Sequence, residues 1–127
     1  MSRVMIIDDD KLFVEEAAET LKLSGYKVHL FTDAEEALAQ IGGIMPAAVL
    51  VDLKMSPVSG FKFTAELRKL PKLANIPVIG MTGFYANDEH RPLIRICGIE
   101  KCLIKPIQPL DIIAALEEAI KGDDSSK

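Results

Sequence analysis

Five short apolar segments alternate with segments of helical periodicity along this chain of 127 residues. The apolar segments are continuous runs at positions 4–7, 28–31, 48–51, 78–81 and 102–104. Continuous runs, as opposed to alternating apolar and polar positions, are typical of strands covered on both faces in a parallel sheet. Strict alternation of such strands with helices implies right-handed crossovers. We therefore expect an α/β fold built on a doubly wound, five-stranded parallel sheet.

The segments between the strands carry start and stop signals of helices. Apolar residues recur at helical spacing from position 11 to 24, Asp10 is expected to cap this helix, and Gly25 to end it. A Thr-x-x-Glu capping box at Thr32 predicts the start of the second helix. Gly42-Gly43 is interpreted as the turn that closes it. No GxGxxG or GxxxxGK[ST] motif follows any strand.

The remaining helices are predicted from similar signals. The third helix is expected to start near Ser59-Gly60, and the last to begin with Pro109 and stop at Gly122. Segment 84–91 is expected to be irregular and mobile, with helix only from about Pro92 to Cys97. The residues expected to face inward from the third helix before Pro71 are Phe63, Leu67 and Leu70. We expect one domain over residues 1–121 and a polar tail over 122–127.

Composition and charge favour a globular protein and argue against a nucleic-acid-binding or membrane-spanning one. Hydrophobic residues make up 49 % and charged residues 27 %, as in an ordinary globular protein. A net charge of −4 argues against nucleic acid or an anionic membrane as the main partner. No apolar run approaches the roughly 20 residues that cross a bilayer, and the start lacks a secretory signal. We expect a cytoplasmic location, with Cys97 and Cys102 as buried thiols that form neither a zinc site nor a CxxC motif.

Chemically related side chains follow four of the strands. Asp8-Asp9 follows the first strand and Asp52 the third, while Thr82 ends the fourth and Lys105 the fifth. The carboxyl ends of parallel strands meet at one edge, where ligands bind. Two carboxylates 4 Å apart repel by roughly 4 kcal/mol at an effective dielectric near 20. Three carboxylates together therefore require a proton or a cation, and an all-oxygen site of this kind suits Mg²⁺.

The other residues of the set point to phosphoryl chemistry. Asp52 is the expected nucleophile, because a carboxylate can carry a covalent phosphoryl group. Lys105 is able to reach such a group, or to pair with Asp52 before phosphorylation. Thr82 offers a hydroxyl donor to a phosphate oxygen. Helix capping is a simpler role for these acids, but it does not explain three carboxylates together with Lys105.

At these residues the chain closely resembles the receiver domain of two-component response regulators. The resemblance extends from about residue 4 to residue 120 and includes Gly60, eight residues beyond Asp52, and the Lys105-Pro106 pair. It implies a flavodoxin-like fold with strand order 2-1-3-4-5 and a cis Lys105-Pro106 bond. It also implies that Asp52 takes a phosphoryl group from a phosphohistidine of a histidine kinase or histidine phosphotransfer protein.

The resemblance further implies roles for the remaining site residues. Asp9 and Asp52 would bind Mg²⁺ directly, Asp8 mainly through water, and the backbone carbonyl of Lys54 would complete the protein ligands. Thr82 and Lys105 would contact the phosphoryl group. Such a domain catalyses only its own phosphorylation and dephosphorylation, and it signals by changing the surface that binds a downstream output protein or domain. The sequence does not name the kinase or the target, nor distinguish a monomer from a homodimer.

The chain departs from the family pattern at four positions. Pro57 follows Ser56 where receivers usually have Met-Pro one position earlier, and Gly83 replaces an alanine after the threonine. Pro92 shortens the fourth helix. Cys102 stands where an aromatic residue normally turns inward on activation. This last departure predicts a weaker or differently routed switch.

Two other functions are compatible with parts of the pattern. A phosphatase of the HAD type would also use an aspartyl phosphate and Mg²⁺, but it needs a general acid two residues after the nucleophile. Lys54 occupies that position here. A receiver-like interaction module that is never phosphorylated is the other alternative, which the complete set of acids disfavours.

Overall fold

A computed structural model describes residues 2–83, 94 and 96–125, with side chains described up to residue 121. Its five strands form one parallel sheet in the order β2-β1-β3-β4-β5. This confirms the predicted doubly wound α/β fold and its strand order. The described elements are β1 Arg3–Ile7, α1 Lys11–Leu23, β2 Lys27–Phe31, α2 Ala34–Ile44, β3 Ala48–Asp52, α3 Gly60–Arg68, β4 Val78–Thr82, β5 Lys101–Ile104 and α5 Pro109–Ser125.

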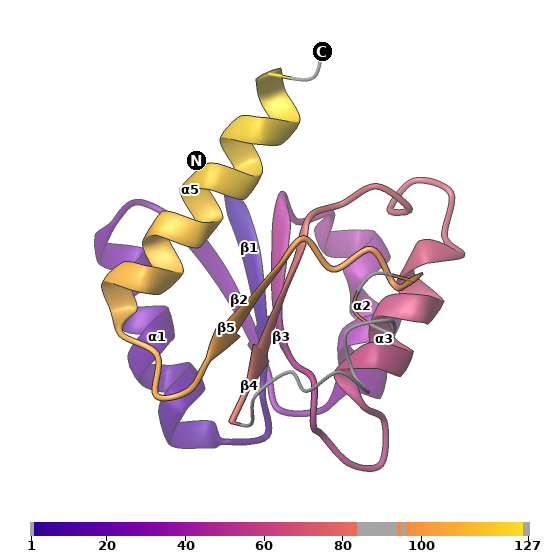
Figure 1. Ribbon diagram of the computed structural model, residues 1–127, viewed down its shortest axis with the longest axis horizontal. Coiled ribbons are helices and arrows are strands. Elements are labelled where there is room, and N and C mark those ends of the chain that lie inside the picture. The colour runs from indigo at the N-terminus through magenta and orange to yellow at the C-terminus, as the bar shows by residue number, and fades with distance from the viewer. Residues whose placement is uncertain (1, 84–93, 95, 126–127) are drawn as a thin grey trace.

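The sheet is sandwiched between two layers of helices. Helices α1 and α5 cover one face, and α2 and α3 cover the other (Figure 1). Successive strand residues point to opposite faces, so Met5 and Ile7 join the core under α2 and α3, whereas Val4 and Ile6 join the core under α1 and α5. The central strands β1, β3 and β4 are almost entirely buried, while the edge strands β2 and β5 are partly exposed. Coverage of both faces is therefore complete only at the centre.

The strand register aligns the ends of the strands at one edge of the sheet. Ile7 of β1 pairs with Val51 of β3, so the residues that follow each of them are neighbours. Asp52 in turn pairs with Met81, and Thr82 pairs with Ile104. The polar residues at the ends of β1, β3, β4 and β5 are thus brought together by backbone pairing alone.

Helix α1 begins and ends as the sequence predicts. The Asp10 side chain accepts a hydrogen bond from the Phe13 N–H and caps the helix. Ser24 is the C-cap, and Gly25 follows with φ +97°. Glycine is the residue that adopts this left-handed conformation without a steric penalty. Both ends of α1 are therefore fixed by local chemistry.

The predicted bounds of α2 are wrong at both ends. Its N-cap is Asp33, not Thr32: the Asp33 carboxylate accepts from the Glu35 N–H at 2.9 Å. A carboxylate one residue closer to the helix satisfies that donor instead of the threonine hydroxyl. Gly42-Gly43 is not a turn, because both glycines lie inside the helix. The helix ends at Ile44, and its C-cap Met45 has a left-handed φ of 52°.

The predicted ends of the third and last helices are also wrong. Helix α3 ends at Arg68, so Leu70 lies beyond the helix and is 38 % exposed instead of facing inward. Helix α5 continues through Gly122 to Ser125. A single glycine costs a helix only about 1 kcal/mol relative to alanine, and it does not by itself end one. The predicted irregular segment 84–91 lies outside the described residues, as do three of the six residues of the helix predicted from Pro92 to Cys97.

The two thiols differ in burial. Cys97 is buried as predicted, whereas Cys102 on edge strand β5 is only partly buried, and both are free cysteines. Burial raises the pKa of both thiols. The part of the chain that the structure describes contains no helix with the length and apolar character of a membrane span.

Candidate functional site

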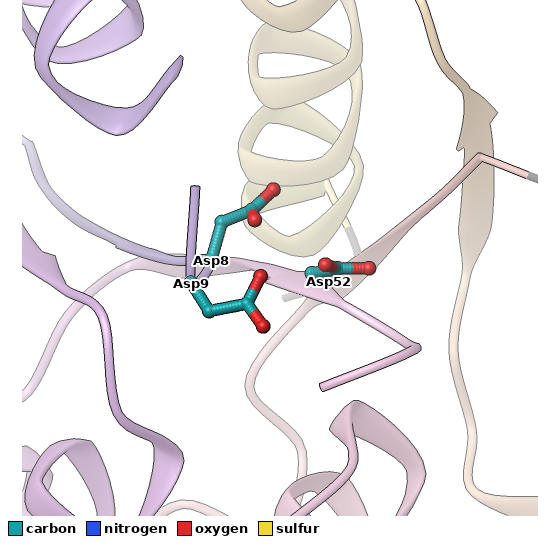
Figure 2. Close-up of side chains that lie close together, drawn as sticks. All are labelled: Asp8, Asp9 and Asp52. Atoms are coloured by element: carbon teal, nitrogen blue, oxygen red, sulfur yellow. The ribbon is translucent and has the colours of Figure 1, made fainter. Parts of the chain in front are cut away.

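Three carboxylates converge at the carboxyl edge of the sheet. Asp8 and Asp9 directly follow β1, and Asp52 is the last residue of β3. One oxygen from each lies within 4.8 Å of the others, and Figure 2 shows the Asp9 side chain extending toward Asp52. Asp8 and Asp52 are buried, while Asp9 is exposed. Three carboxylate oxygens at this separation, one of them open to solvent, form a donor set that fits a hard divalent cation such as Mg²⁺.

Lys105 supplies the positive charge of the site. Its ammonium donates a hydrogen bond of 2.6 Å to Asp8 Oδ2 and lies 3.7 Å from Asp52 Oδ2. The sequence suggested Asp52 as the partner of Lys105 before phosphorylation, but the closer partner is Asp8. Asp8 has no solvent-exposed surface, so it gains more than Asp52 from a direct charged donor.

The backbone and the charges around Lys105 hold its side chain in the site. Its N–H donates to the Thr82 carbonyl at 2.7 Å, and the Lys105-Pro106 bond is cis, as the resemblance implied. Burial pulls the pKa of the Lys105 ammonium down, but the hydrogen bond to Asp8 and the attraction of Asp8 and Asp52 outweigh it. The pKa of Lys105 is therefore raised, and the side chain is a cation at neutral pH.

The Asp52 carboxylate lies in a less favourable environment for its charge. Burial raises the pKa of Asp52, and the hydrogen bond from the Lys54 N–H to Asp52 Oδ1, 3.1 Å long, opposes that shift. The neighbouring Asp8 raises the pKa further, while Lys105 lowers it, and the net direction is upward. The ionised form of Asp52 would therefore be stabilised by an additional cation, and its charge would be removed from the buried carboxylate oxygen that forms a covalent bond.

Thr82 and Lys54 also lie where the sequence places them. Thr82 is the buried last residue of β4, and this strand pairs with β3, which ends in Asp52, and with β5, which precedes Lys105. A Cβ added to the next residue, Gly83, would meet no atom of the described residues within 4 Å. The exposed Lys54 contributes its backbone N–H to Asp52.

Gly60 approaches the backbone of Asp52 too closely for any side chain. A Cβ at this position would clash with the Asp52 carbonyl oxygen and lie 2.8 Å from Leu53 Cα. The Gly60 N–H also donates to the Leu53 carbonyl at 3.3 Å. The start of α3 is therefore packed directly against the strand end that carries Asp52. The glycine eight residues after Asp52 was found from the sequence, but this contact was not.

One residue of the site was missed by sequence reasoning. The Lys105 ammonium lies 5.1 Å from the centroid of the Phe13 ring, which belongs to the first turns of α1. In the sequence Phe13 reads only as one of the apolar positions of that helix. The available signal was its place three residues after the capping residue Asp10, which directs it toward the same edge as the acids.

Comparisons with known proteins agree with this geometry. A model of the response regulator receiver domain family matches residues 4–117. The polar-differentiation response regulator DivK of Brucella anthropi is 34 % identical over 105 residues, which cover 82 % of this chain and 84 % of the relative. Among solved structures, a CheY-like receiver domain protein of Methanospirillum hungatei is 25 % identical, with a TM-score of 0.92 and coverage of 100 % of this chain and 99 % of that chain. The chemotaxis protein CheY4 of Vibrio cholerae is similar in fold, with a TM-score of 0.89, 24 % identity and coverage of 94 % and 98 %.

Proposed function

This chain belongs to the response regulator receiver domain family, and from that premise we propose that Asp52 accepts a phosphoryl group from a phosphohistidine of a histidine kinase or histidine phosphotransfer protein. One observation carries the proposal: three carboxylates within 4.8 Å of one another share an edge with an ammonium 3.7 Å from Asp52. Structural capping accounts for single acids, but not for this cluster. The phosphorylated chain then acts on an output protein or domain.

In the proposed reaction an Asp52 carboxylate oxygen attacks phosphorus. The P–O bond to Asp52 forms as the P–N bond to the imidazole breaks, and the imidazole keeps the electron pair and takes a proton from solvent. Charge spreads over the three equatorial phosphoryl oxygens during such a transfer, so positioning and electrostatics provide most of the catalysis. The product is an acyl phosphate that water later hydrolyses.

The chain's own residues supply much of the charge compensation. Lys105 needs to move little to contact a phosphoryl oxygen on Asp52, because its ammonium already lies between Asp8 and Asp52. The Thr82 hydroxyl is proposed to donate to a second phosphoryl oxygen from the adjacent strand end. Each charged hydrogen bond of this kind is stronger than one between neutral groups.

The donor set fits a divalent cation, and we propose that Mg²⁺ is held directly by Asp9, Asp52 and the backbone carbonyl of Lys54, and by Asp8 mainly through water. When bound, Mg²⁺ neutralises charge on the carboxylates and on the phosphoryl oxygens. The exposed Asp9 leaves one side of the site open to water and to the donor. The pKa of Asp52 is raised by burial, so a cation also favours the ionised form that acts as the nucleophile.

The proposed readout differs from that of most receivers. Cys102 occupies the β5 position where an aromatic side chain usually couples to the threonine, and it packs on the core cluster under α2 and α3. We propose that phosphorylation is reported through other contacts, such as those of segment 84–91. Backbone NMR shifts with and without a phosphoryl mimic test this: a full, ordinary change across the fourth helix and β5 would contradict it.

Incubation with phosphoramidate and Mg²⁺, followed by intact mass measurement, tests the main proposal. Phosphoramidate has the P–N bond of phosphohistidine. The expected result is one added phosphoryl group, which is absent without Mg²⁺ and absent in Asp52→Asn. Failure of the wild-type chain to gain mass would favour the unphosphorylated interaction module. Steady turnover of a generic phosphate ester would favour a phosphatase.

A further inference from the structure

The Phe13 ring and the Lys105 ammonium form a contact that the proposed reaction does not require. Nζ of Lys105 lies 5.1 Å from the ring centroid, within the distance of a cation–π interaction. The Lys105 side chain is 25 % exposed, and Phe13 is partly buried on α1. The ammonium is therefore bounded by a carboxylate on one side and an aromatic ring on another.

A chain of hydrogen bonds fixes the helix turn that carries the ring. The Asp10 N–H donates to Asp8 Oδ1 at 3.0 Å, and Asp10 Oδ1 accepts from the Phe13 N–H at 3.1 Å. The other oxygen of Asp8 accepts from Lys105 at 2.6 Å. These contacts close a circuit in which the two oxygens of Asp8 hold the capping residue and the ammonium. The same carboxylate thus orients both partners of the Phe13–Lys105 contact.

We propose that Phe13 is a positioning residue for Lys105, which keeps the ammonium beside the phosphoryl-accepting carboxylate. This inference rests on the proposed function, in which Lys105 contacts the phosphoryl group. Lysine is a compact charge on a flexible stem with many accessible rotamers, so a single hydrogen bond does not fix its direction. The negative face of the ring attracts the ammonium and restricts the space that its stem can occupy.

A purely packing role for Phe13 predicts a different result. The ring also packs against the core cluster under α1 and α5, and leucine fills much of that space without a π face. Phe13→Leu therefore removes the attraction while it keeps an apolar side chain, and Phe13→Tyr keeps the ring. If Phe13 only packs, the two substitutions change the reaction alike.

The kinetic test measures the initial rate of phosphorylation by phosphoramidate with Mg²⁺. We expect Phe13→Leu to lower this rate about two- to five-fold, which corresponds to the free energy of an exposed cation–π contact. Phe13→Tyr, which keeps the ring, should react at the wild-type rate. In a Lys105→Met background, Phe13→Leu is expected to change the rate no further, since the interaction is already lost. An equal loss in both backgrounds, or wild-type rates for Phe13→Leu, would overturn the inference. Urea unfolding of each variant identifies any loss due to folding.

A second measurement does not depend on phosphorylation. Lys105 Cε is bonded to Nζ, which lies over the Phe13 ring at 5.1 Å from its centroid. We therefore expect the NMR shifts of the Cε protons to lie upfield in the wild type and in Phe13→Tyr, and to return to ordinary lysine values in Phe13→Leu. Asp10→Ala, which removes the cap, is expected to reduce the upfield shift, whereas Asp10→Ser keeps it. Ordinary shifts in the wild type would overturn the positioning role. A wild-type chain with upfield shifts but no phosphorylation would instead refute the proposed function.

Discussion

Lys105 and Asp8 form an ion pair of 2.6 Å in which the carboxylate has no exposed surface and the lysine side chain is 25 % exposed. The pair joins residues from opposite ends of the chain across the edge of the sheet. Asp8 therefore holds the ammonium 3.7 Å from Asp52. Lys105 thus neutralises the buried charge of Asp8 and lies beside Asp52, the proposed phosphoryl acceptor.

Removal of the ammonium is expected to destabilise the fold. Lys105→Met leaves Asp8 buried without its charged donor, and breaking a buried pair typically costs 3–5 kcal/mol. We expect about 2–3 kcal/mol here, because part of the Lys105 side chain is exposed to solvent. Urea unfolding at neutral pH without divalent cations measures the loss.

Lys101→Met is the matched control for Lys105→Met. Lys101 pairs with Glu118 at 3.7 Å, and both side chains are well exposed. Such a pair contributes about 0–1 kcal/mol, so this variant should unfold close to the wild type. Equal losses in the two variants would show that the buried pair has no special role.

Neutralisation of Asp52 is expected to stabilise the chain when Mg²⁺ is absent. The pKa of Asp52 is raised in the fold, first by burial, so its contribution to stability is full below its unfolded pKa and is lost as the pH rises through its folded pKa. At pH 7 the ionised carboxylate therefore opposes folding. Asp52→Asn removes that charge and keeps the oxygen that accepts from the Lys54 N–H.

The pH dependence provides the check on Asp52→Asn. Its gain over the wild type in urea unfolding should be present at pH 7 and shrink as the pH falls toward the unfolded pKa of Asp, about 3.9. Asp111→Asn, an exposed acid on α5, controls for general charge effects. A variant less stable than the wild type at pH 7, or a gain that does not depend on pH, would refute this assignment.

Mg²⁺ is expected to stabilise the wild type, and Asp9 to contribute to that effect without supporting the fold. A ligand present at 100 times its Kd adds about 2.7 kcal/mol to stability. Asp9 is exposed, so Asp9→Asn should change stability by no more than about 0.5 kcal/mol without the ion but raise the Mg²⁺ concentration needed for stabilisation. Thermal unfolding over a Mg²⁺ titration at constant ionic strength measures both quantities. A Tm that does not depend on Mg²⁺ would contradict the proposed metal site.

Substitution by alanine is expected to have opposite effects on stability at two glycines that both lie in helices. Gly60→Ala places a Cβ against the backbone of Asp52 and Leu53, and overpacking of this kind typically costs about 1–3 kcal/mol. A Cβ at Gly42 in α2 would meet no described atom within 4 Å outside the backbone of its own helix turn, so Gly42→Ala should stabilise the chain by about 0.5–1 kcal/mol. Urea unfolding distinguishes the two, and Gly60→Ala should also slow phosphorylation because it displaces the acceptor strand end. A neutral Gly60→Ala would mean that this contact is easily relieved.

Arg68 at the end of α3 joins three segments through its guanidinium. It donates to the carbonyls of Ala74, Ile76, Cys97 and Gly98 at 2.6–3.1 Å. Arg68→Met leaves these acceptors without a charged donor, and we expect a loss of about 2–4 kcal/mol. Lys69→Met is the control, since the Lys69–Glu66 pair is exposed. Urea unfolding of both variants checks this, and a loss below about 0.5 kcal/mol for Arg68→Met would show that water replaces the guanidinium at little cost.

The architecture could be predicted because its signals are local. Continuous apolar runs identify the strands, and the residue after each run identifies what reaches the edge of the sheet. Asp10 and Gly25 were assigned correctly because a cap and a left-handed glycine depend on near neighbours. Thr32 and Gly122 were assigned wrongly because neighbouring residues competed for the same role or tolerated the glycine.

The amino-acid order by itself determined that Asp8, Asp9, Asp52, Thr82 and Lys105 would share one edge, since parallel strands place their carboxyl ends together. Only the tertiary structure decided which carboxylate holds the ammonium, that Phe13 lies against it, and that Gly60 touches the acceptor backbone. These contacts depend on strand register, side-chain direction and the distance between helix and sheet. A shift of an ångström or two in any of these would break such contacts, whereas spacing along the chain specifies only which elements are neighbours.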